Sequence, residues 1–327
     1  MNLPKLQVAK PIFPEVLERL KSHFEVIDNQ SNVPWTFETW THALSDCDAA
    51  LTTSADVINE AVLTHCKQLK MCANMIVGFN NFDLKAMTAR GILATNTPDV
   101  LTQTTADFGL ALILATARRM SEGERFLRAG KWAEWRYDLL SGMDVHGSTL
   151  GIVCMGRIGQ AIAKRAFHGF GMSIIYHNRT RLSAEIEQGL GASWAPLHDL
   201  LQRSDHVILV LPYSPESHHF IGAKEFSLMK KGAHFINLAR GGLVDEDALA
   251  DALISGHLGG AGLDVYEGEP RVNPRLLELE RVVLTPHIAS SSLATRLAMC
   301  QLAADNLIGF FEHAQVKTPL NPEVLKR

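Results

Sequence analysis

Leu150-Gly-Ile-Val-Cys154-Met-Gly156-Arg-Ile-Gly159 is the stretch that decides the fold. A short apolar run rich in β-formers leads into a glycine-containing turn and then into the amphipathic segment 160–168, so the pattern predicts a strand, a tight turn and a helix. Such a turn lets the backbone approach a pyrophosphate, whose charge is favoured by the N–H groups and the dipole at a helix N-terminus. The pattern Gly-x-Gly-x-x-Gly is incomplete, because Cys154 stands at its first glycine. Two interpretations stay open at this point, a dinucleotide site or a glycine-rich turn of an ordinary α/β domain.

The composition is that of a folded globular protein. The chain has 327 residues, of which 46% are hydrophobic, enough for two domains with their own cores. The net charge is −4 and the basic residues are scattered, which argues against a nucleic-acid or membrane-surface partner. The five cysteines contain no Cys-x-x-Cys pair, and the chain opens without the apolar segment of a signal peptide. We therefore expect reduced thiols and a cytoplasmic location, and the apolar stretch 108–115 is too short to span a bilayer.

Strand-like and helix-like segments alternate along the chain. The first half has candidate strands at 6–8, 26–27, 49–52, 71–74 and 92–95. After an apolar helix expected from a cap at Thr104 to Arg119, six more strands are expected at 150–153, 173–176, 206–211, 234–238, 260–265 and 282–285. The final helix, 291–313, is expected to pack on the first domain. This pattern predicts an α/β protein with two doubly wound parallel sheets of the Rossmann or flavodoxin type and a cleft between them. The substrate domain would comprise 1–100 and 291–327, and the dinucleotide-binding domain 101–290.

The strand expected at 173–176 runs into Asn178-Arg179-Thr180-Arg181. An NAD site typically has an acidic residue here that binds the adenine ribose, but this segment has none. Either arginine, with the Thr180 hydroxyl and the Asn178 amide, suits a 2′-phosphate that a carboxylate would repel. The segment therefore favours NADPH, with NADH also possible. The alternative is two solvated loop arginines, which would leave the cofactor preference undetermined.

Three more segments follow expected strands of the second half. They are Asn237-Leu-Ala-Arg240-Gly-Gly, Gly262-Leu-Asp264-Val-Tyr-Glu267-Gly-Glu269-Pro and Thr285-Pro-His287-Ile-Ala-Ser. Each alone has an ordinary explanation, namely a salt-bridged arginine, a solvated acidic loop or a helix-capping histidine. Together they predict an active site, because the carboxyl ends of parallel strands meet at the edge where such sheets bind ligands. In the first half, Val77-Gly78-Phe-Asn-Asn also follows a strand, as a ligand loop or an ordinary polar turn.

These motifs together resemble the D-isomer-specific 2-hydroxyacid dehydrogenases over nearly the whole chain. Val77-Gly-Phe-Asn-Asn-Phe-Asp, Thr116-Ala-Arg-Arg and Asp144-Val-His146 are most similar to the glyoxylate/hydroxypyruvate reductases of that family, also described as 2-ketogluconate reductases. The resemblance implies NAD(P)H-dependent reduction of small 2-oxo acids to D-2-hydroxy acids by a homodimer without a metal ion. The alternatives are a dehydrogenase for another small acid, such as D-lactate, 2-ketogluconate, phosphoglycerate or formate, or an NAD(P)-sensing regulator on the same fold.

The resemblance also implies roles for individual residues. Arg240 would clamp the substrate carboxylate and polarise the keto oxygen, His287 would be the general acid and base, and Glu269 would hydrogen-bond His287. This agrees with the chemistry of a guanidinium fork and of an imidazole that exchanges protons near neutral pH. The backbone N–H groups of Val77 and Gly78 would bind the substrate anion, and Glu267 is expected to be solvated. The implied cofactor contacts are Thr105, Gly156, Arg157, Ile158, Gly159, Asn178, Arg179, Thr180, Leu211, Pro212, Leu238, Ala239, Asp264, which would lie near the nicotinamide, and Ala289.

The sequence departs from the family pattern in two places. Cys154 replaces a glycine, which puts close packing of the helix on the strand in doubt. A tryptophan that some of these reductases carry before Asp-Val is absent, with Leu139 and Leu140 near its place, so the choice of 2-oxo acid stays open. The patch Trp132-Ala-Glu-Trp-Arg-Tyr137 is either an irregular loop or an oligomer contact.

Overall fold

The structure is a computed structural model that describes residues 3–326. The described chain divides into two compact units, one formed by the residues up to Leu101 together with those from Ser292 onward, the other by Thr102–Ser291. Each unit has its own parallel sheet, with five strands in the first and seven in the second. The predicted α/β class with two doubly wound parallel sheets is therefore confirmed. Among the described residues, no helix has both the length and the apolar character that crossing a membrane requires.

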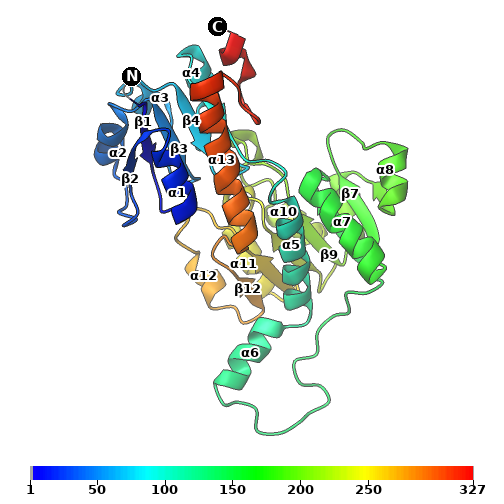
Figure 1. Ribbon diagram of the computed structural model, residues 1–327. Coiled ribbons are helices and arrows are strands. Elements are labelled where there is room, and N and C mark those ends of the chain that lie inside the picture. The colour runs from blue at the N-terminus through cyan, green and yellow to red at the C-terminus, as the bar shows by residue number, and fades with distance from the viewer. Residues whose placement is uncertain (1–2, 327) are drawn as a thin grey trace. The chain divides into compact units, whose positions relative to one another are not determined.

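The first unit is a five-stranded sheet with helices on both faces (Figure 1). Its strands are β1 (Lys5–Val8), β2 (Glu25–Asp28), β3 (Ala49–Thr52), β4 (Met71–Asn74) and β5 (Leu93–Thr95), in the order β2-β1-β3-β4-β5. Alternate side chains of these strands face opposite sides of the sheet. One side packs on α1 (Pro14–Lys21) and on α13 (Leu293–His313). The other packs on α2 (Phe37–Leu44), α3 (Glu60–Leu63) and α4 (Leu84–Ala89).

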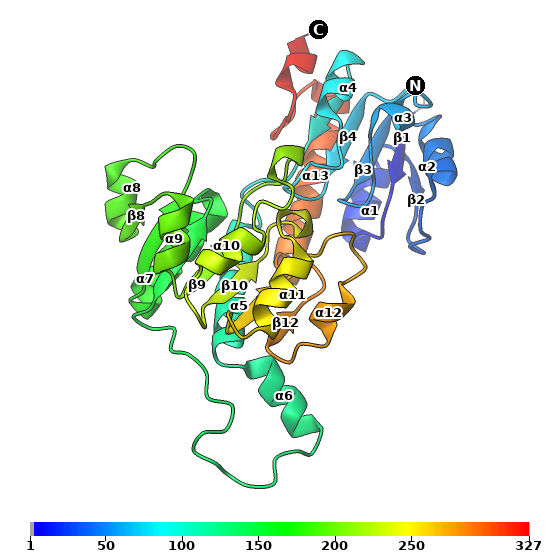
Figure 2. The ribbon, with the colours of Figure 1, turned by 180° about the vertical axis from the view of Figure 1, so that it is seen from behind.

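The second unit is a seven-stranded sheet that reverses its winding at its first strand (Figure 2). Its strands are β6 (Thr149–Val153), β7 (Ser173–His177), β8 (Ala192–Trp194), β9 (His206–Leu209), β10 (His234–Asn237), β11 (Gly260–Leu263) and β12 (Val282–Leu284), in the order β12-β11-β10-β9-β6-β7-β8. One face is covered by α5 (Thr102–Ala117) and α7 (Arg157–Phe170). The other is covered by α9 (Leu197–Arg203), α10 (Ala223–Leu228) and α11 (Glu246–Ile254). The reversal between β6 and β9 creates the switch point at which such sheets bind ligands.

Three local expectations were wrong. The sheet has a seventh strand, β8, which with the preceding α8 (Ala184–Gly189) went unpredicted because it is a three-residue edge strand without a buried apolar run. The helix expected to be capped at Thr104 already begins at Thr102, since no glycine or proline separates these residues. That helix ends at Ala117, and Arg119 takes a left-handed conformation with φ of 52° before a separate helix, α6 (Met120–Arg128).

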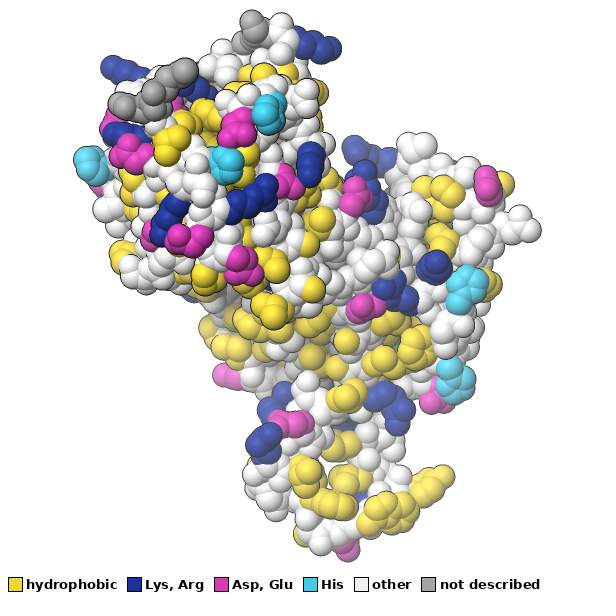
Figure 3. Space-filling view, viewed as in Figure 1, with side chains coloured by type: hydrophobic (Ala, Val, Ile, Leu, Met, Phe, Trp, Pro, Cys, Tyr) yellow, Lys and Arg dark blue, Asp and Glu magenta, His cyan; other side chains and the backbone are white. Residues whose placement is uncertain are grey.

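The segment that contains α6 and residues 129–146 extends away from the seven-stranded sheet in both ribbon views. We call this segment the arm. Hydrophobic side chains gather on it in Figure 3, and those of Trp132, Trp135 and Tyr137 are 54%, 75% and 93% exposed. Large contiguous apolar patches on a protein surface are typical of interaction sites.

Candidate active site

The segments that the sequence predicts to carry chemistry leave the seven-stranded sheet at the edge formed by the carboxyl ends of its strands. The strand register links the residues at this edge, which are Val153, His177, Leu209, Asn237, Leu263 and Leu284. Because all these strands are parallel, the loops that follow them start side by side. The structure therefore brings the glycine turn, Asn178, Leu211, Arg240, Asp264 and His287 to a common edge of the second unit.

The glycine turn fits the pyrophosphate of a dinucleotide. Gly156 is the N-cap of α7 and no side chain caps this helix, so its first turn presents backbone N–H groups. A methyl group placed on Gly156 would meet no atom within 4 Å, which leaves the approach to these groups open. The turn is held by Asn178, whose Oδ1 accepts a hydrogen bond of 2.6 Å from Met155 N. Backbone donors at a helix N-terminus are the chemistry that a phosphate group requires.

The structure corrects the concern about Cys154. Close packing of the helix on the strand depends on Gly159, where an added Cβ would lie 2.6 Å from the carbonyl oxygen of Cys154. Position 159 is a glycine in this chain, so the close packing of the helix on the strand is preserved. Cys154 instead occupies a position with φ of 78°, which glycine adopts readily and other residues rarely do. Burial raises the pKa of its thiol, against the effect of the Gly156 N–H and of the Arg179 charge.

The two arginines after β7 have different partners. Arg181 makes two hydrogen bonds to Glu187, from Nε to Oε1 at 2.8 Å and from Nη2 to Oε2 at 2.7 Å. Glu187 also accepts a bond from the Tyr176 hydroxyl, and hydrogen bonds from Arg181 and Tyr176 lower its pKa to about 2. Arg181 therefore belongs to a local ion pair. Arg179 and Thr180 are exposed after the strand.

Arg240 lies on a loop whose backbone is fixed from two sides. Asn237 accepts a hydrogen bond from Ala239 N at 3.0 Å and donates one to the carbonyl of Arg240 at 2.9 Å. The next residue must be glycine, because a Cβ on Gly241 would lie 1.8 Å from the carbonyl carbon of Tyr266. Burial lowers the pKa of the Arg240 guanidinium, and the charge of Glu269 opposes this effect. Arg240 and Glu269 are thus electrostatically coupled.

His287 and Glu269 form the predicted pair. His287 Nδ1 lies 2.8 Å from Glu269 Oε2, and Tyr266 N donates to Glu269 Oε1 at 3.0 Å. Burial acts to raise the pKa of Glu269, but the hydrogen bonds from His287 and Tyr266 and the charges of His287 and Arg240 hold it below its ordinary value. Glu269 is therefore an anion at neutral pH. Its bond to Nδ1 leaves Nε2 of His287 as the nitrogen that can exchange a proton with a ligand.

Asp264 holds the loop that carries His287, a role that the sequence did not reveal. Its side chain is fully buried and accepts bonds from the Thr285 hydroxyl at 2.7 Å, from Ile288 N at 2.8 Å and from Ala289 N at 2.8 Å. Its backbone carbonyl accepts the N–H of His287 at 2.9 Å. These four bonds fix His287 in a left-handed conformation with φ of 54°. The signal available in the sequence was an acid directly after a buried strand.

Most of the other predicted cofactor contacts are buried near this edge. Leu238, Ala239 and Ala289 are less than 9% exposed, Leu211 is partly buried and Pro212 is exposed after β9. Thr105 on α5 is also buried, and its hydroxyl has no hydrogen-bond partner among the described residues. A buried hydroxyl without a protein partner is suited to bind a ligand.

In the first unit, the Val77-Gly78 loop is anchored through its carbonyl groups. Asn74 Nδ2 donates to the carbonyl of Gly78 at 2.9 Å, and Asn96 Nδ2 donates to that of Val77 at 2.7 Å. Asn74 is fully buried and donates also to Asn81 Oδ1 at 3.0 Å. Within residues 3–326, the N–H groups of Val77 and Gly78 have no acceptor. The loop therefore has the backbone donors that an anion needs, and sequence reasoning overlooked the asparagines that hold it.

Glu267 is exposed to solvent, as expected, but it also has protein partners. Its carboxylate contacts His218 and His219, which lie 48 or more residues earlier in the chain. The motif around Glu267 carries no sign of these histidines, because the contact depends on the packing of two separate loops.

This chain is similar to proteins of known sequence and structure. Residues 110–289 match the family model described as D-isomer specific 2-hydroxyacid dehydrogenase, NAD binding domain. A glyoxylate reductase of Pyrococcus horikoshii is 44% identical over 99% of this chain and 97% of its own. A solved protein of Thermus thermophilus is 39% identical, with a TM-score of 0.89 over 97% of this chain and 99% of that one. A solved NADPH-dependent glyoxylate/hydroxypyruvate reductase of Sinorhizobium meliloti, in complex with NADP and malonate, is 36% identical, with a TM-score of 0.85 over 97% of this chain and 96% of that one.

Proposed function

Because this chain belongs to the D-isomer-specific 2-hydroxyacid dehydrogenase family, we propose that it reduces glyoxylate and hydroxypyruvate to the D-2-hydroxy acids with a reduced nicotinamide dinucleotide. The relatives named above support this substrate class. The observation that carries the proposal is the 2.8 Å contact between His287 Nδ1 and Glu269 Oε2, at the sheet edge that also holds Arg240. This arrangement joins a proton donor and a carboxylate binder, the two groups that reduction of a 2-oxo acid needs.

Arg240 binds and polarises the substrate in this proposal. Its planar guanidinium matches a carboxylate through two parallel hydrogen bonds. It also stabilises the negative charge that grows on the keto oxygen as hydride reaches the carbon. Burial of Arg240 strengthens both effects, because water screens the charges less.

His287 supplies the proton. In the protonated imidazole, Nδ1–H donates to Glu269 and Nε2–H donates to the keto oxygen, which becomes a hydroxyl when the proton moves. The anionic Glu269 stabilises the protonated ring and holds its orientation. Oxidation of the hydroxy acid runs the same steps in reverse, with Nε2 as the base.

The dinucleotide, which supplies the hydride, would be held by the first turn of α7 and by Asn178, Arg179 and Thr180. Arg179 is the arginine proposed for a 2′-phosphate, because Arg181 is engaged with Glu187. The Sinorhizobium relative in complex with NADP supports NADPH as the preferred cofactor. The Val77 and Gly78 N–H groups are proposed to bind the substrate anion.

The reaction is tested with the purified protein and glyoxylate, hydroxypyruvate, pyruvate and 2-ketogluconate, each with NADPH and with NADH. Turnover of the first two, and a loss of about 10²-fold or more in kcat for His287→Ala, would support the proposal. Binding of the dinucleotide without turnover of any 2-oxo acid would instead support the sensor alternative.

Cofactor preference is tested by Arg179→Ala, which should weaken NADPH binding by about tenfold or more and leave NADH binding nearly unchanged. Arg203→Ala, which removes an exposed arginine at the end of α9, is the matched control. Equal losses for both cofactors would exclude a 2′-phosphate contact at Arg179.

We also propose that the arm is the contact of a homodimer. The arm carries three exposed aromatic side chains, and hydrophobic side chains gather on it in Figure 3, as on surfaces that a second subunit covers. Trp135→Glu should produce monomers in sedimentation experiments, and an unchanged dimer would place the contact elsewhere.

A further inference from the structure

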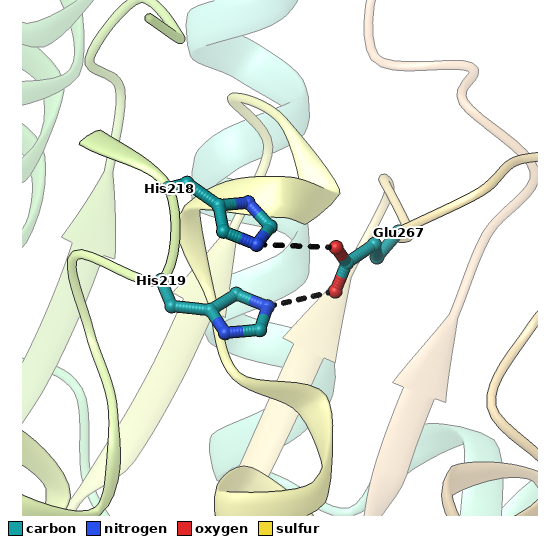
Figure 4. Close-up of side chains that lie close together, drawn as sticks. All are labelled: His218, His219 and Glu267. Carbon is teal, nitrogen blue, oxygen red and sulfur yellow. Dashed lines mark hydrogen bonds and ion pairs between the residues drawn. The ribbon is translucent and has the colours of Figure 1, made fainter. Parts of the chain in front are cut away.

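Two histidines and a glutamate converge on one point of the second unit. Figure 4 shows the rings of His218 and His219 side by side, each directed at one oxygen of Glu267. His219 Nε2 lies 2.9 Å from Oε2, and His218 Nε2 lies 3.7 Å from Oε1. One ligand atom from each of the three side chains lies within 4.8 Å of the others. Within residues 3–326 this is the one such group of His, Cys, Asp or Glu side chains.

The backbone holds the two rings on the same side. Consecutive residues of an extended chain point in opposite directions, but His219 has a left-handed conformation with φ of 51°. As a result the rings stack, with centroids 3.9 Å apart and planes at 22°. The N–H of His219 donates to the carbonyl of Gly242 at 2.9 Å, which ties the loop to the segment after β10.

The partner loop is tied down independently. The N–H of Glu267 donates to Glu246 Oε1 at 2.8 Å, and Glu246 is a buried side chain of α11. The site therefore does not require folding of a mobile segment around an ion, because both loops are already bonded to the framework of the second unit. Preorganised ligands lower the cost of binding.

The charges around the three side chains favour a cation. In the described chain, Glu267 forms ion pairs with His218 and His219 and with no lysine or arginine. A second carboxylate lies beside this group, because Glu246 Oε1 accepts the N–H of Glu267 at 2.8 Å. The side chains of His218, His219 and Glu267 are 40–44% exposed, so an ion can enter from solvent.

The second ring nitrogen of His218 also has a partner. Tyr213 lies with its hydroxyl 3.4 Å from His218 Nδ1. A hydrogen bond to Nδ1 orients the ring and leaves Nε2 toward Glu267, as in histidines that bind metal ions.

We propose that His218, His219 and Glu267 form a binding site for a divalent transition-metal ion, of which Zn²⁺ is the best match. Two imidazole nitrogens and one carboxylate oxygen suit Zn²⁺, and three protein ligands leave a further position for water or an external anion. Each histidine would bind the ion through the unprotonated Nε2 of a neutral ring, so the ion competes with protons and binding weakens as the pH falls. None of the three residues belongs to the proposed reduction machinery, so the inference does not depend on the proposed function.

The test is calorimetric titration of Zn²⁺ into chelator-treated protein without substrate or cofactor. We expect one saturable site per chain in the wild type, with an affinity at least tenfold lower in His219→Ala and in Glu267→Gln. The matched control is His198→Ala, which removes an exposed histidine that lies beside Asp199 on α9 and should leave binding unchanged. Co²⁺ supplies a second readout, since its visible absorption band should develop in the wild type and not in the double variant His218→Ala/His219→Ala.

Two outcomes would overturn the proposal. One is that Zn²⁺ binds the wild type and the double variant equally, which would place the ion elsewhere. The other is that the wild type shows no saturable binding of either metal. Far-ultraviolet circular dichroism of the metal-free variants keeps a folding defect distinct from a loss of ligands. Since no step of the assay involves reduction of a 2-oxo acid, failure here and failure of the proposed function are separate results.

Discussion

Glu269→Gln separates the charge of this side chain from its shape. In the wild type each carboxylate oxygen accepts one N–H, from Tyr266 at 3.0 Å and from His287 at 2.8 Å. A glutamine has a single oxygen, so it can accept only one of these two donors. The variant also removes the negative charge beside the imidazole ring. The protonated form of His287 therefore loses both a hydrogen bond and an ion pair.

The size of the effect follows from distance and exposure. Two unit charges about 4 Å apart attract by about 1 kcal/mol in water and about 4 kcal/mol at a protein surface. The side chains of His287 and Glu269 are 37% and 33% exposed, so water screens them and we take a value of about 1–2 kcal/mol. Since about 1.4 kcal/mol corresponds to a factor of ten, the protonated ring is destabilised by about tenfold or slightly more.

The assay is the pH dependence of glyoxylate reduction, followed through the absorbance of the reduced nicotinamide. Reduction by the variant should fall about tenfold or slightly more in kcat/KM at neutral pH, and the alkaline limb of its rate profile should move to lower pH. Glu278→Gln, which changes an exposed carboxylate next to α12 (Pro274–Leu277), should leave both quantities unchanged. A lower rate with an unmoved pH profile would mean that Glu269 only supports the local structure. An unchanged rate and profile would refute its action on His287.

Three other perturbations test the remaining features. Asn74→Ala removes the bond to the carbonyl of Gly78, so the KM for glyoxylate should rise by about tenfold with a smaller change in kcat, as steady-state kinetics would measure. Cys154→Val should lower the free energy of unfolding by about 1–2 kcal/mol in urea titrations, because a β-branched residue tolerates φ of 78° poorly, whereas Cys154→Gly should stay within about 1 kcal/mol. Burial lowers the pKa of His206 and of His234 from 6.5 to about 4, so the unfolded chain binds protons first as the pH falls. The contribution of these two imidazoles to the stability of the second unit should therefore be complete above pH 6.5 and decline toward pH 4. The expected loss is about 3 kcal/mol for each imidazole, at about 1.4 kcal/mol per pH unit. A His206→Gln/His234→Gln variant should show a flatter dependence of the unfolding free energy on pH.

The elements that could be predicted from the sequence are those with a strong local pattern. The strand, turn and helix at 150–168 are found where apolar periodicity and glycines predict them, as β6 and α7. The pattern was weak for β8, which has three residues at a sheet edge and two exposed side chains. It was also weak at Arg119, where a left-handed residue divides one expected helix from a second one. Apolar periodicity in a sequence indicates that one face of a segment is buried. Neither β8 nor the segment at Arg119 has such a face, so periodicity could not predict them.

The candidate site divides in the same way. The sequence by itself determined which residue types follow which strands, and parallel strands bring their carboxyl ends to one edge, so Arg240, Glu269 and His287 could be selected without coordinates. Only the tertiary structure decided that Arg181 pairs with Glu187 and that Glu267 meets two histidines of another loop. The physical reason is that a pairing between loops depends on the order of strands and on side-chain directions at the surface. Neither of these produces a pattern in the sequence. Burial does so through the spacing of apolar residues, and turn geometry does so through the position of glycines.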